Sequence, residues 1–243
     1  MKKTSLFITC IIDQLVPEVG LAVTKILRKT GYSIDFPSEQ TCCGQPLFNS
    51  GFTKKAKLMA ENTIKIFKNS NSVVIPSGSC TAMIRNFYPD LFKKDPNMYK
   101  DALNLANKTF EFTEFLTKQK LQIPRSLMNN KQKKIAYHPS CHLMRELGIK
   151  QDPIELLKKI TNVTLVPIKN SENCCGFGGT FSIKYSEISE KMLSEKIEAI
   201  KTSKTDIITS CDMSCLMHIG GALKKQKEAI KPLHIAQILA GEE

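Results

Sequence analysis

The sequence predicts an α/β protein of two similar Rossmann-like halves related by internal duplication, each a small parallel sheet flanked by helices. Two observations support this fold class. Strand-like runs alternate with amphipathic helical stretches along the chain, which is the pattern of a parallel sheet with helical crossovers. In addition, four cysteines recur at offsets of 131, 132, 132 and 135 residues: Cys10, Cys42, Cys43 and Cys80, then Cys141, Cys174, Cys175 and Cys215.

The first half reads as strand–helix units in order. Its first buried strand is expected in the apolar residues 6–12, and a helix follows that stops before Gly31. Strand-like runs then cover residues 32–37 and 72–80, with a second helix between them, and residues 109–116 read as a short strand entering a helix. The expected apolar stripes of the two helices are Val19, Val23, Ile26 and Leu27, then Ala56, Ala60, Ile64 and Phe67.

The second half repeats this order. Strand-like runs cover residues 134–141, 163–168 and 206–215, and residues 231–239 again read as a short strand entering a helix. Pro153 opens the first helix between these runs. The expected apolar stripes are Ile154, Leu157 and Ile160 in the first helix, then Ile188, Met192, Ile197 and Ile200 in the second.

These runs divide the chain into a first repeat at residues 1–120 and a second at residues 133–243. The polar stretch from about 118 to 134, which contains Pro124, is the expected linker. The repeated cysteines fall at the carboxyl ends of predicted strands or in the loops just beyond them, where open α/β sheets place their binding sites. Cysteines far apart in sequence can therefore converge on one point in each half.

Charge and hydropathy narrow the possible partners. The formal charge of +12 comes mainly from dispersed lysines, and the dense runs at 131–134 and 224–227 lack the interleaved aromatic residues of a single-strand nucleic-acid surface. We expect no nucleic-acid partner, although a basic surface suits an acidic protein partner. Lys2 and Lys3 precede a short apolar run that Asp13 ends, and no apolar run reaches the 18 residues of a membrane helix. The chain is expected in the cytoplasm.

Nine cysteines, an odd number, indicate metal or redox chemistry rather than structural disulfides. Thiolates are soft ligands that favour zinc, copper(I) or iron–sulfur clusters. Structural zinc usually uses two short CxxC-type pairs, whereas here most cysteines come singly from separate strand ends, and only Cys211 and Cys215 form a short pair.

Each adjacent cysteine pair is followed by glycine. Adjacent side chains on a regular strand point to opposite sides, so the pair needs a bent loop to use both thiols at one site. Gly44 and Gly176 can supply a positive φ or let the backbone come close to a bulky cluster, and Gly178 and Gly179 extend a run whose N–H groups can reach cluster sulfurs. The glycine run lacks the spacing of a dinucleotide-binding fingerprint.

This arrangement resembles the cysteine-rich CCG domain, which occurs twice in one subunit of heterodisulfide reductase and in iron–sulfur subunits of glycolate oxidase. The phrases that carry the resemblance are SLFITC, DFPSEQTCCGQPLFNSGF, PSGSCTAM, HPSCH, NCCGFGGTFSIK and CLMHIGG, and they extend from residue 6 to about 239. By position, the resemblance implies ligands in the first half at Cys10, Cys42, Cys43 and Cys80, and in the second at Cys141, Cys174, Cys175 and Cys215.

The resemblance also implies a function. It implies an electron-transfer subunit with iron–sulfur clusters of the [4Fe-4S] type, not catalytic alone, which works with a second iron–sulfur protein and a third subunit to oxidise L-lactate to pyruvate. Peripheral association with the membrane electron-transport chain is compatible with it. The alternatives are a glycolate oxidase-type subunit, a heterodisulfide reductase-like thiol/disulfide subunit, and a zinc-stabilised interaction module, with zinc also able to replace a lost cluster.

The chain departs from the fuller family pattern, in which each motif ends with two closely spaced cysteines. Met83 stands where the first half would carry the second of these, so we expect the second half to be the firmer site. Cys211 is an extra thiol, either a ligand or a buried spare. His138 and His142 flank Cys141 and can support a cluster rather than a Cys–His nucleophile, because Cys10 has no neighbouring histidine. His218 and His234 are expected to be structural.

Overall fold

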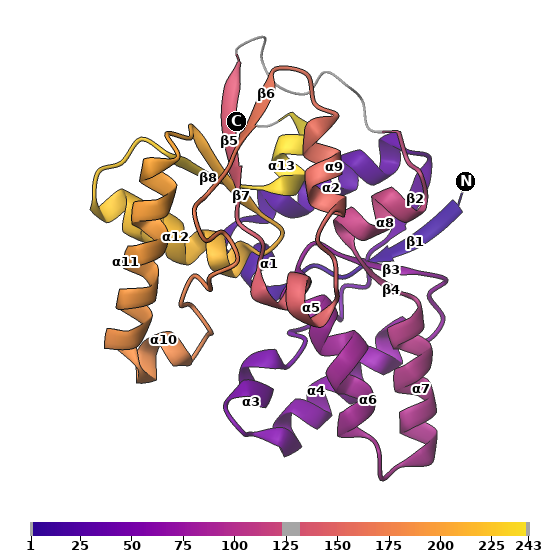
Figure 1. The fold of residues 1–243 in the computed structure, drawn as a ribbon. Helices are drawn as coiled ribbons and strands as arrows, with labels where there is room; N and C mark the ends of the chain where they lie inside the picture. The colour runs from indigo at the N-terminus through magenta and orange to yellow at the C-terminus, as the bar shows by residue number, and fades with distance from the viewer. Residues whose placement is uncertain (1, 123–131, 242–243) are drawn as a thin grey trace. The chain divides into compact units, whose positions relative to one another are not determined.

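The computed structural model describes residues 2–122 and 132–241, and it divides into two compact units, Met1–Gln122 and Ile123–Glu243. Each unit is a four-stranded parallel sheet with helices packed on it, which confirms the predicted α/β fold (Figure 1). The boundary between the two units, after Gln122, falls between the predicted repeats at 1–120 and 133–243. The middle of the predicted linker, residues 123–131, lies outside the described residues.

The sheet of the first unit has the strand order β2-β1-β3-β4, with every pair parallel. Its elements are β1 (Lys2–Leu6), α1 (Cys10–Leu15), α2 (Pro17–Lys29), β2 (Tyr32–Asp35), α3 (Gln45–Asn49), α4 (Thr53–Phe67), β3 (Val73–Ile75), α5 (Gly78–Ala82), the π-helix η1 (Met83–Phe87), α6 (Tyr88–Leu91), α7 (Pro96–Asn107), β4 (Thr109–Glu111) and α8 (Phe112–Lys118).

The sheet of the second unit has the equivalent order β6-β5-β7-β8, again with every pair parallel. Its elements are β5 (Lys133–Tyr137), the π-helix η2 (His142–Glu146), α9 (Asp152–Lys158), β6 (Val163–Val166), α10 (Phe181–Lys184), α11 (Ser186–Thr202), β7 (Ile207–Ser210), α12 (Met213–Lys225), β8 (Lys231–His234) and α13 (Ile235–Ala240). The shared order and the repeated cysteines agree with a duplication. The two units differ by an insertion in the first. The segment from α5 to α7 connects β3 to β4, whereas α12 alone connects β7 to β8 in the second unit.

The first strand differs from its prediction. We expected a strand through residues 6–12, but β1 ends at Leu6 and Cys10 is the first residue of α1. The helix begins there because Thr9 is its N-cap and accepts a hydrogen bond from the backbone N–H of Ile12. Ile12 then packs into the core from a helix rather than from a strand.

The predicted stripe of α4 is buried in full, whereas that of α11 is not. Ile188 is 56% exposed, so its assignment to the core was wrong. The buried position in the first turns of α11 belongs to Ser189, whose hydroxyl donates to the backbone oxygen of Gly176. A polar contact with the cysteine loop thus replaces the expected apolar contact.

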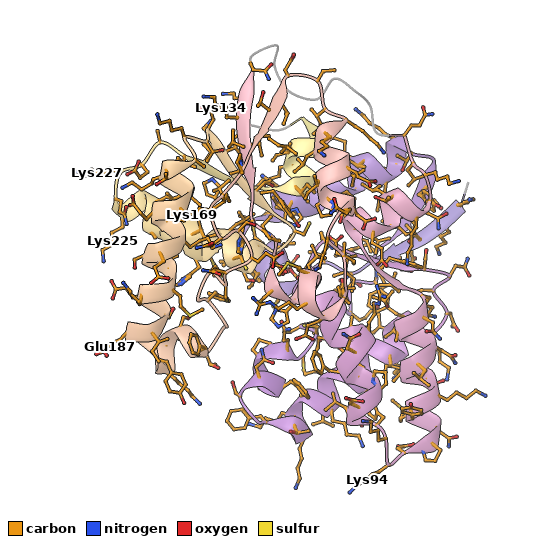
Figure 2. All side chains as sticks on the ribbon, in the orientation of Figure 1. Lys94, Lys134, Lys169, Glu187, Lys225 and Lys227 are labelled. Carbon is orange, nitrogen blue, oxygen red and sulfur yellow. The ribbon has the colours of Figure 1, made fainter. Side chains whose placement is uncertain are left out.

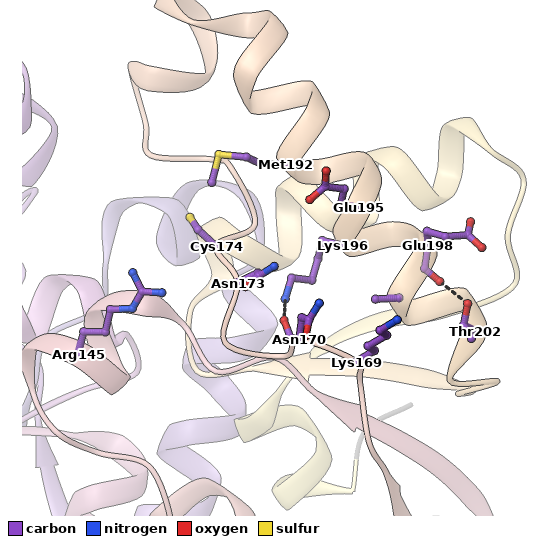
Figure 3. A pocket seen from close by; sticks show the side chains of 11 residues that line it. Arg145, Lys169, Asn170, Asn173, Cys174, Met192, Glu195, Lys196, Glu198 and Thr202 are labelled. Atoms are coloured by element: carbon purple, nitrogen blue, oxygen red, sulfur yellow. Dashed lines mark hydrogen bonds between the residues drawn. The ribbon is translucent and has the colours of Figure 1, made fainter.

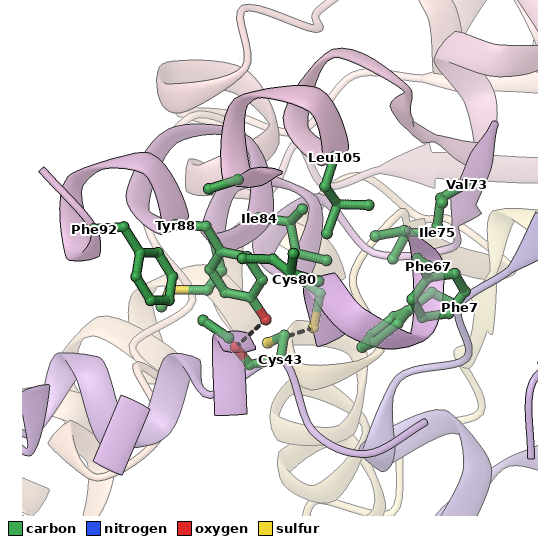
Figure 4. Packing of buried hydrophobic residues seen from close by; sticks show 14 residues of the cluster. Phe7, Cys43, Phe67, Val73, Ile75, Cys80, Ile84, Tyr88, Phe92 and Leu105 are labelled. Atoms are coloured by element: carbon green, nitrogen blue, oxygen red, sulfur yellow. Dashed lines mark hydrogen bonds between the residues drawn. The ribbon is translucent and has the colours of Figure 1, made fainter. Parts of the chain in front are cut away.

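The core of the first unit reaches its cysteines. Cys43 and Cys80 are buried among Phe67, Ile84 and Tyr88 on one face of the sheet, and the Tyr88 hydroxyl donates to the Cys43 carbonyl oxygen at 2.8 Å (Figure 4). The lysines that give the chain its positive charge stand largely on the outside. Lys134, Lys225 and Lys227 are exposed and project from the ribbon (Figure 2).

Candidate metal centres

The thiols of each unit gather at the point where the strand order reverses. In the first unit β1 lies between β2 and β3, so the connections that leave β1 and β3 run in opposite directions at their carboxyl ends. Cys10 follows β1, Cys80 follows β3, and the Cys42–Cys43 pair lies in the loop after β2. Cys141, Cys215 and the pair at 174–175 hold the same places in the second unit. This crevice is where open α/β sheets bind ligands.

Helix N-termini hold the first and last thiols of each set. Thr9 caps the helix that begins at Cys10, and the Ser140 hydroxyl accepts equivalently from the N–H of Leu143 just after Cys141. Ser77 caps α5 and accepts a hydrogen bond from the N–H of Cys80 at 3.3 Å. These caps fix the backbone that carries Cys10, Cys80 and Cys141.

Asp212, the counterpart of Ser77, is the N-cap residue of α12, and Cys215 occupies the third position of that helix. The Asp212 carboxylate accepts a hydrogen bond from the Ser140 hydroxyl at 2.6 Å. The segments that carry Cys141 and Cys215 are thereby tied to each other.

The cysteine pairs sit in bent loops that depend on glycine. Gly44 has φ +85° and Gly176 has φ +88°, and the N–H of each lies 3.4 Å from the sulfur of the first cysteine of its pair. A Cβ on Gly176 would come within 2.7 Å of the Ser189 backbone oxygen, so the loop lies directly against α11. The positive φ expected of these glycines is present, and the close approach that the structure shows is to a helix, so an approach to a cluster stays a prediction.

The four thiols of the first unit interact with one another. The sulfurs of Cys43 and Cys80 are 3.2 Å apart. Hydrogen bonds from Cys10 and Cys43 lower the pKa of Cys42, whose sulfur accepts them. The hydrogen bond to Cys42 is also the main reason why the pKa of Cys10 is raised, with burial second, and hydrogen bonds to Cys42 and Cys80 raise the pKa of Cys43.

The second unit repeats this arrangement. Hydrogen bonds from Cys141 and Cys175 lower the pKa of Cys174, and the pKa values of Cys141 and Cys175 are raised, first by their hydrogen bonds to Cys174 and then by their other neighbours and burial. In both units the first cysteine and the first member of the pair are half-buried, and the other two are buried. The first unit therefore brings its four repeated thiols together as the second does, and the expectation that the second is the firmer cluster site stays a prediction.

These sets fit a bound metal or iron–sulfur centre. The donors are soft sulfur atoms, and hydrogen bonds among them lower the pKa of the first cysteine of each pair, Cys42 and Cys174. A cation bound among them would favour the thiolate form of all four. Which cysteines act as ligands stays a prediction.

His138 adds a nitrogen donor to the thiols of the second unit. It is 1% exposed, and one of its ring nitrogens lies within 4.8 Å of both the Cys175 and the Cys215 sulfurs, which are equally close to each other. Burial, and after it the charge of Lys196, lowers the pKa of His138 to about 3, so the imidazole is neutral. Neutral imidazole is the form that binds metals.

The other predicted residues lie at the edges of the second site. The His142 Nδ1 atom is 3.6 Å from the Cys141 sulfur. Cys211 is fully buried with its sulfur 3.7 Å from the Tyr137 hydroxyl, and whether it is a ligand or a spare thiol stays a prediction. Gly178 and Gly179 have φ +52° and +65° in the loop after the pair.

Sequence reasoning missed Lys196. This lysine is 2% exposed on α11, and its ammonium donates to the backbone oxygens of Ser171 at 2.9 Å and Asn170 at 3.3 Å. Burial lowers its pKa, and Cys175, Cys174 and Cys215 act in the opposite direction. A signal was available, because Lys196 lies midway between Met192 and Ile200 in the apolar stripe.

His218 was expected to be structural, and its ring packs against Phe177 at 5.7 Å between centroids, with Nε2 3.4 Å from the Ser189 hydroxyl. Burial lowers the pKa of His218, and Cys174 opposes that shift. His234 accepts a hydrogen bond from the N–H of Ala236 at the start of α13, which is the structural role expected of it.

An open cavity of about 690 Å³ adjoins the second site. Cys174, Asn173 and Arg145 line one end of it, and the stem of Lys196 crosses its wall toward Asn170 (Figure 3). The sulfur of Cys174 is therefore the ligand candidate with a route to solvent on this side.

Comparisons with known proteins agree with this architecture. Residues 4–85 and 135–220 each match the family model of the cysteine-rich domain, CCG. The chain is 43% identical to lactate utilization protein A 2 of Bacillus cereus strain Q1 over 98% of both chains. It is 44% identical to lactate utilization protein A of Oceanobacillus iheyensis, over 98% of this chain and 96% of that one. The chain belongs to the lactate utilization protein A family. As a member with two CCG domains, it carries one complete set of four repeated cysteines inside each matched segment.

Among the helices of the described residues, none is long and apolar enough to cross a membrane.

Proposed function

We propose that this chain binds one iron–sulfur centre in each unit and transfers electrons in a complex that oxidises L-lactate to pyruvate. The observation that carries the proposal is the twofold convergence of four thiols at the switch point of a parallel sheet. The names of its relatives, lactate utilization protein A, support the metabolic assignment.

The ligands we propose are the four repeated cysteines of each unit. When bound, an iron–sulfur centre supplies reversible one-electron transfer. The chain's own residues hold the donors in place. Capped helices carry the first and last thiols of the first unit, Ser140 ties the segments of Cys141 and Cys215 together in the second, and glycine loops carry the pairs. The N–H groups of Gly44 and Gly176 lie against sulfurs, where they stabilise negative charge.

The metal content tests the first part. Protein purified without oxygen after iron-replete expression is expected to contain iron and acid-labile sulfide in comparable amounts. Cys43→Ser and Cys175→Ser are each expected to remove about half of the iron, because each disrupts one set. Cys211→Ser tests the buried thiol outside the two repeated sets: full iron content would make it a spare thiol, and a loss of iron would make it a further ligand. Folded protein without iron and sulfide would contradict the proposal, and zinc without sulfide would support an interaction module instead.

The substrate requires a separate experiment with the partners present. We propose that a second iron–sulfur protein and a third subunit complete the complex. Anaerobic complex is expected to show reduced centres in this chain after addition of L-lactate, and the isolated chain is expected to show none. Reduction by glycolate but not by L-lactate would assign the glycolate oxidase-type role, and spectral changes produced only by a disulfide would assign the thiol/disulfide role.

A further inference from the structure

The strongest unassigned feature is the buried imidazole of His138. The side chain is 1% exposed, and within the described part of the chain neither ring nitrogen makes a hydrogen bond of acceptable geometry. A buried polar group without such a bond is unfavourable and indicates a missing partner. One ring nitrogen nevertheless lies within 4.8 Å of both the Cys175 and the Cys215 sulfurs.

The surroundings of His138 suit a metal-bound imidazole. Its backbone N–H is bound to the carbonyl oxygen of Thr209 at 2.8 Å, which places the residue at the carboxyl end of β5 beside β7. Burial lowers the pKa of the ring, and the backbone of Ser171 acts against that shift although the contact lacks hydrogen-bond geometry. A backbone carbonyl is a common second partner of a metal-bound histidine, because it holds the other ring nitrogen in its protonated form.

The repeat provides an internal comparison. His138 precedes Cys141 by three residues, and Phe7 precedes Cys10 by three residues. Phe7 is fully buried against Phe67, with ring centroids 5.7 Å apart, and has no atom that binds a metal. The same place in the two units therefore holds a hydrocarbon ring in one and a nitrogen donor in the other.

We propose that His138 is a nitrogen ligand of the metal centre in the second unit, next to Cys175 and Cys215. The inference rests on the proposed function, because it assumes that this thiol set holds a centre. It makes the two centres chemically different. The first is bound by sulfur alone, and the second has one neutral donor in addition to its thiolates, which leaves its ligand set less negative for each donor.

Selective labelling tests this inference without relying on activity. Protein with ¹⁵N-histidine is prepared anaerobically in two backgrounds: Cys43→Ser, which keeps the second centre, and Cys175→Ser, which keeps the first. Pulsed EPR of the reduced Cys43→Ser protein is expected to show strong ¹⁵N coupling of a directly bound histidine, and Cys175→Ser is expected to show none. Adding His138→Phe, which reproduces Phe7, should remove the coupling, whereas His142→Phe and His218→Phe should leave it.

The outcomes separate the two claims. Iron and sulfide in the Cys43→Ser protein without ¹⁵N coupling would overturn the ligand role of His138 and leave the proposed function intact. Coupling that survives His138→Phe would likewise overturn it and assign another histidine. If the labelled wild-type protein holds no iron and sulfide at all, the proposed function fails first, and the inference falls with it.

Discussion

Replacing Gly176 by alanine tests how closely the second cysteine loop lies against α11. The new Cβ would come 2.7 Å from the Ser189 backbone oxygen and 3.2 Å from the Met192 Cβ, on a backbone with φ +88°. Gly179 is the matched control, because its φ is +65° but no atom lies within 4 Å of an added Cβ. The two substitutions share the backbone penalty and differ in the steric clash.

The magnitude follows from these two contributions. A left-handed backbone costs a non-glycine residue about 1–2 kcal/mol, and forced close packing adds about 1–3 kcal/mol. Gly179→Ala should therefore cost about 1–2 kcal/mol and Gly176→Ala about 2–5 kcal/mol. For a unit of the size of Ile123–Glu243, each kcal/mol lowers the melting temperature by roughly 4 °C.

Thermal unfolding of metal-free, reduced protein measures both variants by circular dichroism. We expect a fall of roughly 8–20 °C for Gly176→Ala and 4–8 °C for Gly179→Ala, confined to the second unit. Gly44→Ala should act on the first unit alone and be milder than Gly176→Ala, because its nearest contacts are 3.1 Å and 3.4 Å. Equal effects of Gly176→Ala and Gly179→Ala would refute the close approach of this loop to the helix.

Two further predictions concern charge near the second centre. The contacts of the two cysteine loops align α4 with α11: Ala56 and Met59 lie against Gly44 as Ser189 and Met192 lie against Gly176. In this alignment Thr63 of the first unit is the counterpart of Lys196. Lys196→Thr removes a positive charge near the thiols and should lower the reduction potential of the second centre in an EPR-monitored titration. Lys191→Thr, on the exposed face of α11, is the control and should leave the potential unchanged. An unchanged potential in Lys196→Thr would show that its charge is screened. As the pH falls from about 6.5 to 3, metal-free protein should also lose about 1.4 kcal/mol of stability per pH unit, because the unfolded chain protonates His138 at a higher pH than the folded chain does. In chemical unfolding at several pH values, His138→Phe should flatten that slope, and an unchanged slope would assign it to other groups.

The sequence was sufficient to predict the α/β architecture and which cysteines lie near one another. Parallel strands bring their carboxyl ends to one edge, so the regular offset of the repeat places the four thiols of each unit without any knowledge of side-chain contacts. The position of Cys10 was harder. Its apolar neighbours suit a strand as well as a helix, and a single hydroxyl, that of Thr9, decides the matter by capping α1.

Lys196 and Ile188 show what local patterns leave out. Whether a lysine in an apolar stripe is buried depends on acceptors from a distant segment, here the carbonyls of Asn170 and Ser171, which have no sequence signature. Ile188 is exposed for the converse reason, since Ser189 binds the Gly176 loop in its place. Both contacts join residues more than ten positions apart, beyond the reach of helical periodicity.

The spread of each thiol set along the chain has a consequence for folding entropy. The chain between Cys10 and Cys80 contains β2 and β3 of the first unit, and the chain between Cys141 and Cys215 contains β6 and β7 of the second. A centre bound by both would be a covalent bridge across a long loop, and closing a long loop restricts the unfolded chain more than closing a short one. Losing the metal would thus remove this restraint from the strands and helices between the cysteines, so that the holo- and apo-proteins should differ in resistance to proteolysis well away from the cysteines.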